Sequence, residues 1–311
     1  MSTVAVIGAG IGGLATAVRA AASGRSVAVF EAAPEIGGKL RQLRIGDYRF
    51  DLGPSLFTWP QLLTDTLALA GDAAAPFAYQ QLDRSCHYFW EDGTRFTAWS
   101  DPTALKEEIS QAFGVDPSAA LQHLERSREG FEATRGLFLE QSLHEPSSWT
   151  PGRTAAHLRS AWRGRRALPL TRNLNNWNRR AGHPKLQQLF NRYATYNGSD
   201  PYRAPAMLHV IPHLEFGMGT FAPEGGMHAI VEALYRTACN LGVTFHLSTP
   251  VDRILTSGGQ VTGIESGGQQ HTADIVVSGA DVTPTYRRLL PDQPAPERIL
   301  SAESSTSGVL F

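Results

Sequence analysis

The chain has only two cysteines among its 311 residues, Cys86 and Cys239, and they form no metal-binding or redox spacing. This scarcity argues against a disulfide scaffold and fits a reducing cytoplasm, where we expect both cysteines to be packing residues. No apolar run reaches the roughly 18 residues that span a bilayer, and the N-terminus enters a predicted strand at once. We therefore expect neither a transmembrane helix nor a secretory signal.

Acidic residues are scarce between positions 151 and 200, where Asp200 is the only one. The same stretch holds ten basic residues: Arg153, Arg159, Arg163, Arg165, Arg166, Arg172, Arg179, Arg180, Lys185 and Arg192. The whole chain has 28 basic and 29 acidic residues, which leaves 18 basic and 28 acidic residues elsewhere. Such a block suggests an anionic partner. We do not expect nucleic acid, because no recognised nucleic-acid module accompanies the charge.

The clearest motif lies in the first 31 residues. A short apolar run at 4–7 predicts a buried strand that leads into G-A-G-I-G-G at 8–13. A small-residue helix follows, and then a second buried strand at 26–30 that ends on Glu31. This strand, glycine turn, helix and strand form the fingerprint of a dinucleotide-binding unit.

Each residue of the fingerprint has a chemical reason. Gly8 allows the tight turn, and Gly10 lets the backbone approach a pyrophosphate at the helix N-terminus. Gly12 lies in the same turn, and Gly13 lets the helix pack closely on the strand. Glu31 lies 18 residues after Gly13, close to the usual spacing of about 20, and can accept hydrogen bonds from a ribose diol.

The rest of the chain changes character twice. Short strands are predicted at 40–44 and 48–51 and a β-hairpin at 86–97, followed by helices at 102–113, 117–143 and, with breaks near Pro169 and Pro184, 152–196. An α/β pattern returns after residue 220, with a helix at 227–241 and strands at 243–247, 251–255, 261–265 and 275–278. The dinucleotide-binding domain is therefore predicted to be discontinuous.

Several further motifs accompany the glycine fingerprint and Glu31, beginning with Gly37-Gly38-Lys39 and Phe50-Asp51-x-Gly53-Pro54. They continue with the stretches at 193–201 and 211–215, with Pro223-x-Gly225-Gly226-Met227, and with the residues 278–281 and 286–290. Together these motifs resemble the bacterial phytoene desaturase family of FAD-dependent carotenoid desaturases. The stretch at 85–93 is most similar to the branch that includes 1-hydroxycarotenoid 3,4-desaturases.

This resemblance implies an α/β fold with a discontinuous Rossmann-like FAD-binding domain and an inserted α+β substrate domain. The implied division is FAD-binding at 1–76, substrate or membrane-facing at 77–222, FAD-binding at 223–290, and an incomplete return to the substrate domain at 291–311. Family members usually run to about 500 residues, so the chain is expected to be truncated at its C-terminus. FAD is expected to bind through Gly8, Gly10, Gly12, Gly13, Glu31, Gly38, Lys39 and Val251.

The implied reaction removes two hydrogens from adjacent carbons of a polyene, with flavin supplying the redox chemistry. Such a substrate requires an apolar tunnel. No catalytic base can be assigned: His213, Glu215 and Glu224 are candidates, although Glu215 could instead pair with an arginine and Glu224 could be exposed in a turn. The alternatives are a truncated, non-catalytic flavin- or carotenoid-binding protein and a flavin oxidase of the amine or porphyrinogen type.

The basic block also suggests where a carotenoid enzyme meets its substrate. Residues 152–196 combine arginines with the apolar side chains Leu158, Trp162, Leu168, Leu170, Leu174, Trp177, Leu186 and Phe190. That combination suits an anionic membrane surface. We expect a cytoplasmic protein that is peripheral on the inner face of the membrane, with quinone or oxygen as its electron acceptor.

Overall fold

The computed structural model describes residues 2–141, 146–164, 167–169, 171–295 and 297. The chain divides into two compact units. The first, called here the split unit, combines the residues up to Gln80 with those from Phe221 onward. The second, the inserted unit, comprises the residues Gln81–Thr220.

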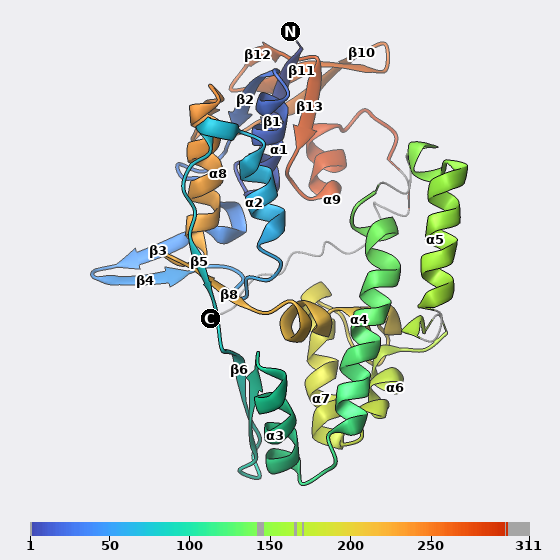
Figure 1. Cartoon of the computed structure of the whole chain (residues 1–311). Coiled ribbons are helices and arrows are strands. Elements are labelled where there is room, and N and C mark those ends of the chain that lie inside the picture. The colour runs from blue at the N-terminus through green and yellow to red at the C-terminus, as the bar shows by residue number, and fades with distance from the viewer. Residues whose placement is uncertain (1, 142–145, 165–166, 170, 296, 298–311) are drawn as a thin grey trace. The chain divides into compact units, whose positions relative to one another are not determined.

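The split unit is built on a four-stranded parallel sheet in the order β13-β1-β2-β9 (Figure 1). The strands are β1 (Thr3–Ile7), β2 (Ser26–Phe30), β9 (Thr244–His246) and β13 (Ile275–Ser278). β1 and β2 are apolar along nearly their whole length because a parallel sheet is covered on both faces. The α/β fold class that the sequence predicts is therefore confirmed.

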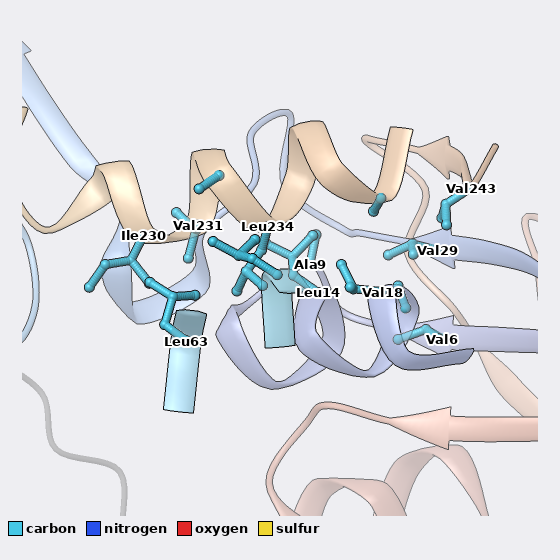
Figure 2. Packing of buried hydrophobic residues seen from close by; sticks show 14 of the residues in the cluster. Val6, Ala9, Leu14, Val18, Val29, Leu63, Ile230, Val231, Leu234 and Val243 are labelled. Atoms are coloured by element: carbon cyan, nitrogen blue, oxygen red, sulfur yellow. The ribbon is translucent and has the colours of Figure 1, made fainter. Parts of the chain in front are cut away.

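Helices α1 (Ile11–Ala22) and α8 (His228–Asn240) lie side by side against this sheet. Figure 2 shows Leu14 and Val18 of α1 close to Leu234 of α8, with Val6 and Val29 of the strands beside them. These side chains are almost completely buried. Burying one such side chain contributes about 1.5–3 kcal/mol, so this interface anchors the loops that leave β1 and β2.

Smaller elements complete the split unit. They are η1 (Gly38–Leu40), β3 (Gln42–Ile45), β4 (Tyr48–Asp51), α2 (Gln61–Ala68), η2 (Gly71–Ala73), β5 (Tyr79–Gln81), β8 (Phe221–Pro223), β10 (Arg253–Ser257), β11 (Gln260–Ser266), β12 (Gln269–Thr272), α9 (Val282–Pro284) and η9 (Thr285–Leu289). β3 and β4 form an antiparallel hairpin, and β10, β11 and β12 form an antiparallel three-stranded sheet.

The inserted unit is mainly helical. Its elements are β6 (Arg84–Phe89), β7 (Arg95–Trp99), α3 (Pro102–Phe113), α4 (Ser118–Phe138), η3 (Pro146–Trp149), α5 (Pro151–Arg163), α6 (Leu174–Asn178), η5 (Arg179–Ala181), α7 (Pro184–Asn191), η6 (Arg192–Asn197), η7 (Ala206–Val210) and the π-helix η8 (His213–Gly217). Asp101 caps α3, because its Oδ1 accepts a hydrogen bond from the Ala104 amide at 2.8 Å.

Several predicted boundaries were wrong. The strand predicted at 40–44 begins at Gln42 because Gly38–Leu40 forms a 3-10 turn first. The helix predicted at 117–143 ends at Phe138, and residues 142–145 lie outside the described residues. β12 was not predicted, because its sequence QQHT lacks apolar alternation. Of the predicted segment 291–311, residues 296 and 298–311 lie outside the described residues.

The prediction for the cysteines was half wrong. Cys86 is partly buried and packs against the core of the inserted unit. Cys239 is exposed, because the buried face of α8 at this point is formed by its neighbour Ala238. No helix in the described part of the chain is both long and apolar enough to cross a membrane.

Candidate cofactor and substrate site

The glycine turn after β1 is held by backbone contacts that exclude larger residues. Gly8 has a φ of +95°, and its amide donates a hydrogen bond to the Phe30 carbonyl at 2.8 Å. A Cβ atom on Gly13 would lie 2.0 Å from the Gly8 carbonyl oxygen. By contrast, a Cβ on Gly12 would meet no atom within 4 Å. Gly13 is therefore required by packing, whereas Gly12 faces open space.

The second glycine pair lies directly against the first turn. The Gly37 amide donates to the Ala9 carbonyl at 2.9 Å, which forms an isolated parallel bridge between Gly10 and Gly37. A Cβ on Gly38, whose φ is +55°, would lie 3.2 Å from the Gly10 Cα. The structure thus brings together two motifs that are 27 residues apart, in a cradle formed by backbone alone.

Glu31 follows β2 and points its carboxylate back to the glycine turn. Oε2 accepts from the Ala9 amide at 2.6 Å, and Oε1 accepts from the Ala33 amide at 2.9 Å. Each carboxylate oxygen has a second lone pair, so the group can also accept from an external hydroxyl. Glu31 is only partly buried.

The two remaining predicted cofactor residues lie at the edges of this region. Lys39 is exposed in η1. Val251 is partly buried just before β10 and packs with a small core cluster. The preceding residues Ser248 and Thr249 donate their amides to the carbonyls of Ala33 and Glu31, at 2.9 and 2.8 Å. This pairing places the segment before Val251 alongside Glu31.

A cavity of about 840 Å³ lies within the split unit next to the second glycine pair. Its lining comes from α1, η1, the segment 52–59, α2 and α8, and it includes Ile11, Ala15, Lys39, Leu52, Pro54, Leu56, Phe57, Trp59, Leu62, Met227 and Ile230. Most of these side chains are apolar. Phe57 and Trp59 were not predicted from the sequence. The signal that could have pointed to them is the motif around Gly53, which lies shortly before them in the chain. Gly53 packs against η1, because a Cβ there would lie 1.7 Å from the Lys39 carbonyl oxygen.

Two of the family motifs meet at the start of α8. The Asp51 carboxylate, at the end of β4, accepts from the Met227 amide at 3.2 Å. Arg49 donates to the Gly225 carbonyl oxygen, and Gly226 has a φ of +89°. The Gly225-Gly226 pair therefore shapes the entry to α8 and is tied to the β3–β4 hairpin.

Glu215 is fully enclosed in the inserted unit. Arg192 Nη2 donates to its Oε2 at 2.9 Å, Tyr193 donates to Oε2 at 2.8 Å, and Tyr196 donates to Oε1. Burial raises the pKa of both tyrosines above the ordinary value, and Glu215 raises it further through its charge at Tyr193 and its hydrogen bond at Tyr196, which keeps both groups protonated as donors. The predicted pairing of Glu215 with an arginine is therefore present, and its oxygen lone pairs are largely used by these three donors. Glu215 is only 1% exposed to solvent.

The other two candidate bases have different surroundings. His213 begins the π-helix η8 and is half-buried, and burial lowers the pKa of its imidazole. Glu224 is exposed in the turn after β8, as the alternative interpretation of the sequence expected. Nothing in these surroundings identifies either group as a base. Within the described residues, no group of three or more His, Cys, Asp or Glu could hold a metal ion.

The apolar residues predicted to face a membrane mostly do not. Leu174, Trp177, Leu186 and Phe190 are at most 5% exposed and belong to the inserted unit's interior, because α6 and α7 pack on their neighbours. Leu158 and Trp162 of α5 are exposed, at 67% and 69%. Leu168 is partly buried, and Leu170 lies outside the described residues. The prediction was therefore wrong for α6 and α7.

Comparison with known proteins decides the family. The profile of the family described as flavin containing amine oxidoreductase matches residues 11–310. The chain belongs to this family. Membership supports FAD as the cofactor.

Three similar proteins extend this finding. The chain is 42% identical to 1-hydroxycarotenoid 3,4-desaturase of Flavobacterium sp. (strain P99-3), over 100% of its own length and 63% of the relative's. It is 30% identical to 4,4'-diapolycopene oxygenase of Methylomonas sp, over 99% of its length and 62% of the relative's. A solved oxidoreductase from Methanosarcina mazei has a TM-score of 0.61 at 19% identity and covers 94% of this chain and 62% of its own.

These comparisons confirm the predicted resemblance to carotenoid desaturases. The solved structure supports the fold alone, because its sequence identity is low. The chain spans less than two thirds of the length of the curated relatives that it matches.

Proposed function

We propose that the complete protein is an FAD-dependent carotenoid desaturase that acts on a polyene of the phytoene or hydroxycarotenoid type. The observation that carries this proposal is the backbone cradle of Gly10 and Gly38 beside Glu31, in a flavin-family chain that is 42% identical to a 1-hydroxycarotenoid desaturase. No other constellation of reactive side chains on the described residues competes with it.

The cradle fits a dinucleotide. Gly10 is the N-cap of α1 and has no side chain to cap it, so the first amides of the helix can donate to a pyrophosphate. Gly38 and Gly10 pack closely because neither has a Cβ atom, and Gly12 leaves open space for the approach of the pyrophosphate. We assign the ribose hydroxyls to Glu31, the adenine to the backbone at Val251, and a charge contact to Lys39.

FAD, when bound, supplies a hydride acceptor for the carbon from which hydrogen leaves. The chain's own contribution is to hold that cofactor and to exclude water from the substrate. The apolar cavity that contains Phe57 and Trp59 suits a polyene, because the transfer of apolar surface from water is favourable there. Glu215 is engaged by three donors, so we assign it to holding η8 to η6 and assign no base.

The proposal is tested by expressing the complete polypeptide in cells that accumulate phytoene or 1-hydroxycarotenoids. We expect flavin absorbance in the purified protein and a product two hydrogens lighter in at least one strain. A folded, flavin-loaded protein that leaves every pigment unchanged would contradict catalysis and favour the non-catalytic binding protein. Limiting either oxygen or quinone in lysates would identify the electron acceptor.

A second reaction class deserves the same assay, because one relative is named as an oxygenase. Oxygen insertion adds about 16 mass units to the carotenoid, whereas desaturation removes about two, so mass spectrometry separates the two outcomes. The same purified protein is also assayed with amines as substrates. Peroxide release from diamines, with carotenoids untouched, would instead place the protein among the amine oxidases.

We also propose that the protein is cytoplasmic and peripheral on the inner face of the membrane. Support comes from the basic block and from the exposed Leu158 and Trp162 of α5, a helix that also carries Arg153 and Arg159. Apolar burial and attraction to anionic lipid would then add together. Fractionation of cells that express the complete protein, with washes of rising salt, tests this location.

A further inference from the structure

A cluster of arginines in the inserted unit has no role in the proposed chemistry. Arg172, Asn176, Arg179 and Arg180 line a cavity of about 530 Å³ around α6 and η5, and this set is called here the arginine pocket. Asn176, Arg179 and Arg180 lie on the consecutive helical elements α6 and η5, whereas Arg172 lies in the segment just before the N-cap residue Asn173. Residues three and four apart on a helix are surface neighbours, which explains why Asn176 lies beside Arg179 and Arg180 in the cavity.

The three guanidinium groups lack a counter-charge. Among the described residues, no carboxylate lies within ion-pair distance of Arg172, Arg179 or Arg180. Nη1 of Arg180 is buried and has no hydrogen-bond partner in the described part of the chain. A buried donor without a partner destabilises a fold, so the group is expected to have an external acceptor.

Arg180 is also fixed in position. Its guanidinium stacks on the Trp177 ring at 4.3 Å from the ring centre, and Trp177 is 5% exposed and lies against His209. Partial burial, followed by the charges of Arg172 and Arg126, lowers the pKa of Arg180 below its ordinary value. The site thus holds positive charges together at a cost that an anion would relieve.

We propose that the arginine pocket binds a phosphate group. A guanidinium presents a planar fork of donors that matches the oxygens of a phosphate, and Asn176 adds an amide donor. The ligand is a phosphomonoester or phosphodiester, carried either by a lipid headgroup or by a soluble molecule. This proposal is independent of the carotenoid reaction, and in its lipid form it would mark one point of membrane contact.

Two arms of one experiment distinguish the sources. Isothermal titration calorimetry measures the affinity of the chain for inorganic phosphate and for glycerol phosphate, and compares both with its affinity for chloride at matched ionic strength. Flotation compares vesicles of phosphatidylcholine alone, with phosphatidic acid, and with oleate, which supplies negative charge without phosphate. We expect phosphate to bind in preference to chloride, phosphatidic acid vesicles to recruit the chain in preference to oleate vesicles, or both. Recruitment only by vesicles identifies a lipid ligand, and saturation only in solution identifies a soluble one.

Variants localise the effect. Arg179→Gln with Arg180→Gln should weaken binding at least tenfold, whereas Arg203→Gln with Arg236→Gln, two exposed arginines outside the pocket, should change it less than twofold. If the double variant fails to fold, Arg179→Lys replaces it as the test, because lysine keeps the positive charge but lacks the planar fork of donors. Equal binding of chloride and phosphate together with equal recruitment by oleate and phosphatidic acid would overturn the proposal. Equal loss in both double variants would overturn it as well.

Discussion

Each unit contains a carboxylate that is held by hydrogen bonds, and the two are held by different kinds of donor. In the split unit, Glu31 accepts from the backbone amides of Ala9 and Ala33. In the inserted unit, Glu215 accepts from the side chains of Arg192, Tyr193 and Tyr196. The first arrangement leaves acceptor capacity for a ligand, whereas the second closes a buried network. The split unit therefore builds its site from backbone, and the inserted unit stabilises its interior with paired side chains.

The largest effect should come from breaking the backbone site at Gly13. In Gly13→Ala the new Cβ would lie 2.0 Å from the Gly8 carbonyl oxygen. The backbone fixes the positions of both atoms, so no side-chain rotation can relieve the clash. We expect the turn to open, with flavin affinity falling more than 100-fold and the melting temperature falling as well. Flavin absorbance per protein and a thermal scan measure the two effects.

Gly12→Ala is the matched variant, one residue away in the same helical turn. Its Cβ meets no protein atom within 4 Å, so its melting temperature should equal or exceed that of the wild type, since alanine favours helix over glycine by about 1 kcal/mol. A loss of flavin without a loss of stability would show that the dinucleotide occupies the open space. A Gly13→Ala protein with wild-type melting and flavin content would refute the packing argument.

The next effect concerns the closed network. Glu215→Ala removes the carboxylate from a partly buried Arg192, and breaking a buried pair in this way costs about 3–5 kcal/mol of unfolding free energy. Urea unfolding followed by circular dichroism measures it. Glu125→Ala is the control, because its pair with Arg128 is exposed to solvent and such pairs contribute about 0–1 kcal/mol. Equal losses in the two variants would show that the Glu215 network contributes no special stability.

This contrast also explains what could be predicted from the sequence. The tight turn at Gly8 and the close packing at Gly13 could be predicted because both depend on backbone geometry within one short segment, whereas the ribose contact of Glu31 stays a prediction. The partners of Glu215 could only be suggested as an arginine, because Arg192 is 23 residues away and their contact depends on tertiary packing. Trp177 was misassigned for the same reason. The sequence shows that aromatic and basic residues are neighbours along the chain, but it does not show which side of a short helix is buried.

A smaller effect is expected at Glu31. Glu31→Ala removes a charged acceptor from the predicted ribose site and should weaken FAD binding by about 1–3 kcal/mol. The loss of its bonds to Ala9 and Ala33 will also loosen the turn, so affinity should be measured by flavin fluorescence titration well below the melting temperature. Glu35→Ala, an exposed glutamate in the following loop, is the control and should bind FAD as tightly as the wild type does. Unchanged affinity in Glu31→Ala would remove Glu31 from the cofactor site.

The smallest effect, counted per pH unit, should be a dependence of the inserted unit's stability on pH. His123 is fully buried, and within the described residues neither of its ring nitrogens has a hydrogen-bond partner. Burial, followed by the neighbouring His209 and Arg126, lowers the pKa of His123 to about 3. The unfolded chain binds a proton near pH 6.5, which the folded chain rejects until about pH 3. Stability is therefore fully present above pH 6.5 and is lost as the pH falls, by about 1.4 kcal/mol per pH unit.

Urea unfolding at pH 7, 6 and 5 measures how the free energy of unfolding changes with pH. His123→Leu removes one titrating group, so it should reduce this slope by about 1.4 kcal/mol per pH unit. Exposed His87→Gln is the control for the removal of a histidine as such. His209 should contribute a similar slope, because burial lowers its pKa to about 4. If His123→Leu keeps the wild-type slope between pH 6 and 5, then His123 takes up a proton in the folded state. The inserted unit would in that case admit water or an acceptor beside it, and its interior would be less closed than the Glu215 network indicates.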